Sequence, residues 1–207
     1  MIILDFGSGE TCRNDIGIVR KMIDALVDIK PKKKVVIKWQ LFANFPQLIP
    51  LRKEIFHDAQ SYAYQHGIET TASVFDYESL EFLLHYDIPF VKIANLKDIY
   101  YLVDLVPRGI KSVVSYSDIE TYKLVKQMHN VYPLACVRKY PSNEDDYKHF
   151  SSKQMKYGIS DHTKGFGLYN KYKPKFYETH YKLNDSVGLD NGPWSKTPEQ
   201  LKEILCN

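Results

Sequence analysis

The chain has 207 residues, of which 44% are hydrophobic and 26% are charged, and its formal net charge at pH 7 is +3. These values are typical of one globular domain with a sizeable core, and they argue against a disordered chain or a nucleic-acid-binding protein with a broad basic face. The three cysteines fit neither a disulfide framework nor a metal site, and no apolar run approaches the ~20 residues of a membrane helix. We therefore expect a cytoplasmic protein whose partners include neither nucleic acid nor a membrane.

Eight short apolar runs rich in β-branched residues recur along the chain and predict strands. In chain order they span residues 2–6, 35–39, 68–75, 90–95, 112–116, 132–137, 155–160 and 175–181.

Amphipathic segments with apolar residues at helical spacing lie between most of these runs and predict helices. They span residues 15–29, 50–67, 76–87, 118–130 and 197–205. Asp15 is expected to cap the first helix, Gly67 to end the second, and Thr197 followed by Pro198 to begin the last. The connections before the seventh and eighth runs are polar or short, so only brief helices are expected there.

Strands that alternate with helices predict βαβ units and a parallel sheet. Eight such units predict closure into a compact (β/α)8 TIM barrel, and the lack of a G-x-G-x-x-G segment after the first run argues against a dinucleotide-binding fold. We expect residues 1–207 to form this single domain.

The active site of a TIM barrel is built from residues at the carboxyl ends of its strands. Lys38 and Lys92 stand inside otherwise apolar runs, and a buried ammonium group needs a partner. Its structural partner would be Asp5, Glu69 or Glu178, whereas a functional partner would be a bound phosphate or carboxylate. The other polar residues at the predicted strand ends are Gln40, Ser73, Asp76, Asn95, Ser115, Arg138, Tyr140, Ser160, Asp161, His162 and His180.

His162 and His180 end two neighbouring runs, so adjacent barrel strands would aim both imidazoles at one point. Two imidazoles with water and substrate oxygens make a reasonable site for a divalent metal such as Mn²⁺, with Zn²⁺ as an alternative. Glu178 points the same way as His180 and would be a ligand or an orienting partner. Cys136 is interpreted as a core residue. Spacing thus favours an anion-binding, metal-assisted barrel enzyme without selecting a reaction.

Seven segments, in chain order, are VIKWQ, SVFDYESLEFL, IPFVKIAN, YPS, YGISDHTKG, YETHYKL and PWSKTPEQL. In these segments the chain resembles the sialic acid synthase family, whose members condense phosphoenolpyruvate with a sugar to make nine-carbon keto acids. The resemblance runs from about residue 15 to about residue 205, and it is most specific at Ser-Asp-His-Thr and at Glu-x-His of the last run.

The resemblance implies condensation of phosphoenolpyruvate with an aldehyde sugar similar to N-acetylmannosamine, giving a sialic-acid-type keto acid and phosphate. It implies that His162 and His180 hold Mn²⁺ or another divalent metal, that Gln40 and Tyr140 face the acceptor sugar, and that Asp161 belongs to the substrate site. The implied ligands of phosphoenolpyruvate are Lys38, Ser73, Lys92, Ser115 and Ser160, with Asn95 in place of a serine. Lys38, Lys92, Glu178 and the two histidines would carry the catalysis.

The chain departs from the family pattern mainly at positions expected to face the acceptor. Arg138 stands where serine or threonine is usual, and Lys97 stands where an acid is usual. The acceptor-binding acid would be Asp190, or Asn191 in a match without gaps. The family's amino-terminal Asn-His-x-Gly element is replaced here by GSGETCRND, in which Glu10 is the candidate counterpart. The family's C-terminal antifreeze-like domain is expected to be absent, so a homodimer would need another interface.

Two other functions stay open at this point. Lys38 or Lys92 would serve as a Schiff-base nucleophile in a lysine-dependent aldolase. Alternatively, a barrel that has lost its acceptor side would persist as a binding or scaffold protein.

Overall fold

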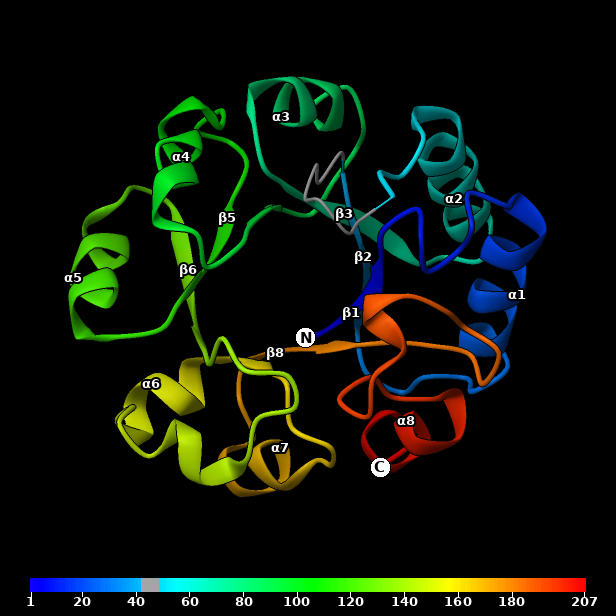
Figure 1. Ribbon diagram of the computed structural model, residues 1–207. Coiled ribbons are helices and arrows are strands. Elements are labelled where there is room, and N and C mark those ends of the chain that lie inside the picture. Colours follow the sequence, from blue (N-terminus) through cyan, green and yellow to red (C-terminus); the bar gives the residue numbers. More distant parts are fainter. Residues whose placement is uncertain (42–48) are drawn as a thin grey trace.

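The computed structural model describes residues 1–41 and 49–207, which contain a closed barrel of eight parallel strands. The strands are β1 (Ile2–Gly7), β2 (Val35–Gln40), β3 (Glu69–Val74), β4 (Val91–Ile93), β5 (Ser112–Tyr116), β6 (Val131–Cys136), β7 (Gly158–Asp161) and β8 (Phe176–His180). Each strand pairs with the next, and β8 pairs with β1, so the ring closes. The predicted TIM barrel is confirmed, and Figure 1 shows the helices surrounding it.

The helices follow the strands around the outside of the barrel. They are α1 (Ile16–Val27), α2 (Lys53–Gln65), α3 (Tyr77–Leu83), α4 (Leu102–Leu105), α5 (Ile119–Gln127), α6 (Ser152–Tyr157), α7 (Gly167–Tyr172) and α8 (Pro198–Leu205), with short 3₁₀ turns η1 (Lys97–Ile99), η2 (Glu144–Tyr147) and η3 (Leu189–Asn191). The caps are as expected, because Asp15 accepts from Ile18 N and Thr197 accepts from Gln200 N. Gly67 has a φ of 70°, the left-handed conformation that ends a helix after α2.

Two elements differ from the sequence prediction. The apolar run at 155–160 divides between the end of α6 and the start of β7, because Ser151 caps a helix that extends through Tyr157. The η1 and α4 turns after β4 were not predicted, since neither is long enough to show helical periodicity.

The interior of the barrel is divided into an apolar and a polar layer by the two-residue period of the strands. The apolar layer, near the amino ends of the strands, contains Ile3, Val36, Phe90, Val113, Leu134 and Phe176. Two positions further along the same segments stand Asp5, Lys38, Lys92, Ser115, Cys136 and Glu178, which line a pocket. The barrel is therefore filled at its amino end and polar at its carboxyl end.

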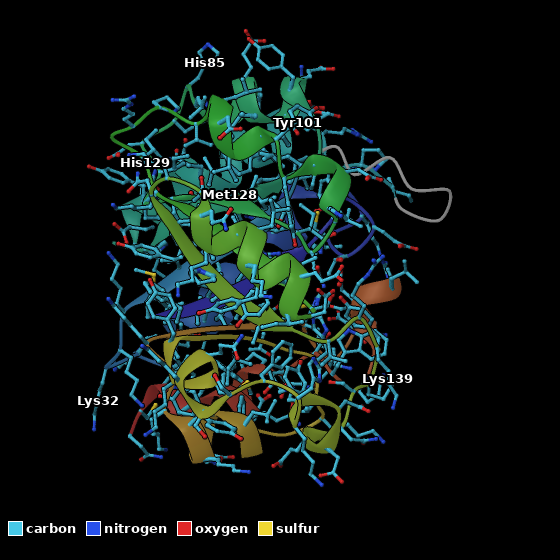
Figure 2. The ribbon with its side chains drawn as sticks, turned by 90° about the vertical axis from the view of Figure 1, so that its left-hand side faces the viewer. Lys32, His85, Tyr101, Met128, His129 and Lys139 are labelled. Carbon is cyan, nitrogen blue, oxygen red and sulfur yellow. The ribbon has the colours of Figure 1, made fainter. Side chains whose placement is uncertain are left out.

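The two ends of the barrel are visible from the side in Figure 2. Lys32 and His129, which precede β2 and β6, lie at one edge, and Lys139, which follows β6, lies at the opposite edge. A larger apolar cluster fills the space between the strands and the helices. None of the helices described here is both long enough and apolar enough to span a bilayer.

Candidate functional site

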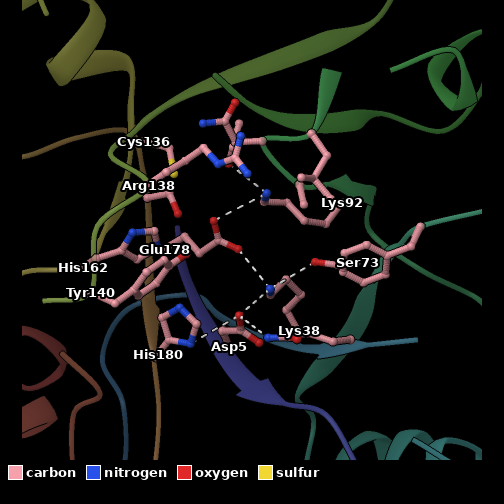
Figure 3. A pocket seen from close by; sticks show the side chains of 17 residues that line it. Asp5, Lys38, Ser73, Lys92, Cys136, Arg138, Tyr140, His162, Glu178 and His180 are labelled. Atoms are coloured by element: carbon pink, nitrogen blue, oxygen red, sulfur yellow. Dashed lines mark hydrogen bonds and ion pairs between the residues drawn. The ribbon is translucent and has the colours of Figure 1, made fainter. Parts of the chain in front are cut away.

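A pocket of about 360 Å³ opens at the carboxyl ends of the strands, and every strand or the segment just after it contributes to its lining. Most of the residues expected at the site line this one pocket. They are Lys38, Gln40, Ser73, Lys92, Asn95, Ser115, Arg138, Tyr140, Ser160, His162, Glu178 and His180. Side chains that are far apart in the sequence therefore meet around a single cup (Figure 3).

The floor of the pocket is a network of buried charges. Lys38 Nζ lies 2.6 Å from Asp5 Oδ2 and 3.3 Å from Glu178 Oε1, and it donates a hydrogen bond to Ser73 Oγ at 3.0 Å. Lys92 Nζ lies 3.6 Å from the other oxygen of Glu178. Glu178 thus serves both lysines, and each of these three side chains is at most 6% exposed. Of the partners considered from the sequence, Asp5 and Glu178 fill the role, while Glu69 pairs with Lys34 on the outside.

Burial and ion pairing shift the pKa values of Glu178, Lys38 and Lys92 in opposite directions, and which effect prevails differs among the three groups. Burial opposes the charge of Glu178, but Lys92 and Lys38 outweigh it and lower the pKa of the carboxyl to about 2. For Lys38, Asp5 and Glu178 outweigh burial, so its pKa is raised. For Lys92, burial dominates and the single shared carboxylate does not compensate, so its pKa is lowered. The ammonium of Lys92 is therefore the less well compensated of the two.

The two histidines lie side by side at the pocket wall, with ring centroids 5.4 Å apart. His162 Nδ1 donates to Val137 O at 2.7 Å, and burial followed by the charge of His180 lowers its pKa to about 3. His180 Nδ1 lies 2.8 Å from Asp190 Oδ1 and 3.5 Å from Asp5 Oδ2. In each ring the Nδ1 atom faces an oxygen acceptor of the protein.

These two imidazoles fit a divalent cation held by two protein ligands. A neutral imidazole whose Nδ1 is engaged by a carbonyl or carboxylate has its Nε2 oriented for a metal, the usual pattern at histidine metal sites. Within residues 1–41 and 49–207 no group of three His, Cys, Asp or Glu side chains forms a ready-made cage. The remaining positions around such a cation would fall to water and substrate oxygens.

Asp190 lies behind His180 rather than in the pocket lining. It is 6% exposed, its Oδ1 contacts His180, and its Oδ2 accepts a hydrogen bond from Thr11 Oγ1 at 3.1 Å. The sequence placed Asp190 or Asn191 against the acceptor. In the structure Asp190 contacts the imidazole of His180, and Asn191 is exposed at the end of η3.

Replacing Asp190 with asparagine is expected to weaken Mn²⁺ binding about 10- to 100-fold, because the carboxylate that faces His180 Nδ1 is lost. The measurement is titration of Mn²⁺ followed by the EPR signal of the free ion, without turnover. Asp185→Asn, an exposed position in the same connection, is the matched control and should change the affinity less than twofold. Equal Mn²⁺ affinities in D190N and the unmodified protein would show that the contact does not support metal binding.

Asp161 also lies outside the pocket, and it is fully buried. Its carboxylate accepts hydrogen bonds from Tyr177 Oη at 2.7 Å and from Thr163 N at 2.7 Å. Burial raises the pKa of this carboxyl. Asp161 thus shapes the turn that follows β7 and presents the neighbouring His162.

Sequence reasoning treated Asp5 only as a lysine partner and Cys136 only as a core residue. Both line the pocket, and the two-residue period from Ile3 to Asp5 and from Leu134 to Cys136 is the signal that would have placed them there. Burial raises the pKa of the Cys136 thiol to about 11, so it stays protonated.

A closed eight-stranded parallel barrel with a charged pocket at the carboxyl ends of its strands is the architecture of (β/α)8 proteins that carry their sites at that end. Comparison with known sequences identifies a family within this class. The chain belongs to the NeuB family, whose sequence signature matches residues 29–207.

One curated relative and two solved structures resemble most of the chain. An uncharacterized protein of Methanocaldococcus jannaschii is 26% identical over 178 residues, covering 77% of this chain and 53% of the relative, so the chain spans about half the length of that curated relative. The N-acetylneuraminic acid (sialic acid) synthetase of Leptospira borgpetersenii, solved with citrate, aligns with 24% identity and a TM-score of 0.79 over 99% of this chain and 81% of that one. A putative spore coat polysaccharide biosynthesis protein E of Chromobacterium violaceum aligns with 18% identity and a TM-score of 0.79, over 99% and 72% of the two chains.

Proposed function

We propose that the protein condenses phosphoenolpyruvate with an aldehyde sugar to form a sialic-acid-type keto acid and phosphate. The observation that carries this proposal is the pocket of a NeuB-family barrel in which two buried ammonium groups and two imidazoles line one cup. Cations on one side suit the phosphate and carboxylate of phosphoenolpyruvate, and the imidazoles on the other suit a metal near the acceptor.

In this reaction the enol carbon of phosphoenolpyruvate attacks the aldehyde carbon of the sugar, water adds to the resulting cationic carbon, and phosphate leaves by cleavage of its C–O bond. Lys38 and Lys92, with Ser73 and Ser115, hold the anionic groups and orient the enol. His162 and His180 would hold a divalent cation, which when bound polarises the aldehyde oxygen. Gln40 donates to Asp5 at 3.1 Å and stands at the edge of the same cup, where a sugar hydroxyl would meet it.

The test is an assay of phosphate release from phosphoenolpyruvate with Mn²⁺ and a panel of aldoses, including N-acetylmannosamine. Release is expected only when phosphoenolpyruvate, Mn²⁺ and an aldose are all present, and removal of Mn²⁺ with EDTA should abolish it. A purified protein that does not bind phosphoenolpyruvate by calorimetry would refute the proposed reaction.

A lysine-dependent aldolase is the second candidate, because burial lowers the pKa of Lys92 and a neutral amine is the nucleophile that forms a Schiff base. Borohydride reduction in the presence of a carbonyl substrate would then attach that substrate covalently to Lys92, as seen by peptide mass spectrometry. Phosphate release without any such adduct would decide for the condensation.

A further inference from the structure

The two candidate metal histidines lie just beyond the last paired residues of β7 and β8. The ladder between these strands ends at Asp161 and Thr179, and His162 and His180 are the residues that follow. Pairing within the sheet therefore does not extend to the histidines themselves. Their ring centroids are 5.4 Å apart, and a cation held by both rings requires that this separation be maintained.

Lys196 lies near these strand ends, in the connection between β8 and α8, and it is fully buried. Its Nζ donates hydrogen bonds to Thr163 O at 2.5 Å and to Trp194 O at 2.8 Å, and lies 5.6 Å from the centroid of the Phe166 ring. Among the residues that the structure describes, no carboxylate lies within ion-pair distance of this nitrogen. The amine thus ends among backbone carbonyls.

Lys196 is bonded to the main chain at both strand ends. Thr163 directly follows His162, so the hydrogen bond to Thr163 O holds the segment that carries this histidine. The Lys196 N–H donates to His180 O at 2.8 Å, and Lys196 forms a parallel bridge with Tyr181. One residue therefore connects the end of β7 to the end of β8 at the point where the ladder between them has stopped.

The second carbonyl, that of Trp194, ties the amine to the segment that carries Asp190. Ser195 Oγ donates to Asp190 O, and Asp190 Oδ1 lies 2.8 Å from His180 Nδ1. The Trp194 ring contacts the ring of Tyr140, with centroids 5.5 Å apart, and Tyr140 in turn stacks on the other candidate imidazole. The contacts of the amine thus lead to the surroundings of both rings.

We propose that Lys196 is a positioning residue, which holds the carboxyl ends of β7 and β8 together so that His162 and His180 bind one divalent cation. A methionine would fill the same buried space without the cost of burying an amine, so packing does not explain the residue. What the amine adds is direction, because it donates to carbonyls of two separate connections at once. The cation belongs to the proposed function, on which this inference rests.

The experiment measures the affinity for Mn²⁺ by the EPR signal of the free ion, and the affinity for inorganic phosphate by calorimetry in metal-free buffer. Lys196→Met keeps the length of the side chain and removes the donor. It is expected to weaken Mn²⁺ binding at least about tenfold and to change phosphate binding less than about twofold. Lys196→Gln keeps a donor of shorter reach and should weaken Mn²⁺ binding by a smaller factor, about three- to tenfold.

Lys33→Met is the matched control. Lys33 is partly buried, and its Nζ also donates to two oxygens, Tyr169 Oη at 3.0 Å and Ile204 O at 2.7 Å. It precedes β2, at the opposite end of the barrel from the pocket. Its loss should change the Mn²⁺ affinity less than twofold.

An Mn²⁺ affinity in K196M within twofold of the unmodified protein would overturn the inference. So would equal losses of Mn²⁺ and phosphate affinity, because the whole pocket would then be disturbed. Thermal unfolding shows whether each variant is folded at the temperature of measurement, and K196Q decides by the same twofold limit if K196M is not folded. Mn²⁺ binding that depends on Lys196, in a protein that releases no phosphate from phosphoenolpyruvate, would support this inference and refute the proposed condensation. Absence of Mn²⁺ binding in the unmodified protein would refute the metal site and this inference with it.

Discussion

Replacing Glu178 with alanine is expected to lower the free energy of unfolding by about 3–5 kcal/mol, because the change leaves two buried lysines with one carboxylate between them. Glu178 lies 3.3 Å from Lys38 Nζ and 3.6 Å from Lys92 Nζ, and all three side chains are almost fully buried. The loss would be measured by urea unfolding followed by circular dichroism.

Glu69→Ala is the matched control for this prediction. Glu69 also pairs with a lysine, Lys34, which immediately precedes β2. This pair is on the surface, because the side chain of Glu69 is 46% exposed and that of Lys34 is 55% exposed. A surface pair of this kind contributes about 0–1 kcal/mol. Equal losses in E178A and E69A would contradict the view that Glu178 neutralises the interior of the barrel.

Replacing His162 with asparagine is expected to reduce aldose-dependent phosphate release at least about 10³-fold, because one of two imidazoles proposed to hold the cation is lost. Binding of Mn²⁺, followed by EPR, should fall in the same variant. The fold should persist, because His162 is not part of the apolar core and the substitution removes one hydrogen bond, to Val137 O.

His149→Asn provides the control, because this exposed histidine lies outside the pocket, where it contacts Ser117 O and the ring of Phe150. Its Mn²⁺ affinity and its activity should match those of the unmodified protein within twofold. Unchanged Mn²⁺ affinity in H162N would remove His162 from the proposed metal site.

The placement of the pocket was predictable because strand geometry repeats every two residues. A lysine inside an apolar strand, such as Lys38 or Lys92, has to face either the barrel interior or the helices, and in the interior the carboxylates of Asp5 and Glu178 contact these ammonium groups. The same alternation explains why the polar layer lies above the apolar cluster. The fold and the position of the pocket thus follow from the two-residue alternation within each strand and from closure of the ring of strands.

The orientation of side chains in the irregular segments was not predictable in this way. Asp190 follows β8 in a turn without periodicity, and its direction depends on Thr11, which lies 179 residues away. Arg138 was expected on the acceptor side, yet its side chain turns toward Lys92. For Asp190 a tertiary contact decides the direction, and in neither case does the neighbouring sequence encode it.

Because Glu178 belongs to β8, the carboxylate that Lys38 and Lys92 share is synthesised after both lysines. A ribosome-bound chain that ends at β7 lacks this carboxylate and exposes two open strand edges, one on β1 and one on β7. During synthesis the ring of strands therefore cannot close before β8 is available. Closure of the ring then coincides with the pairing of Glu178 with Lys38 and Lys92.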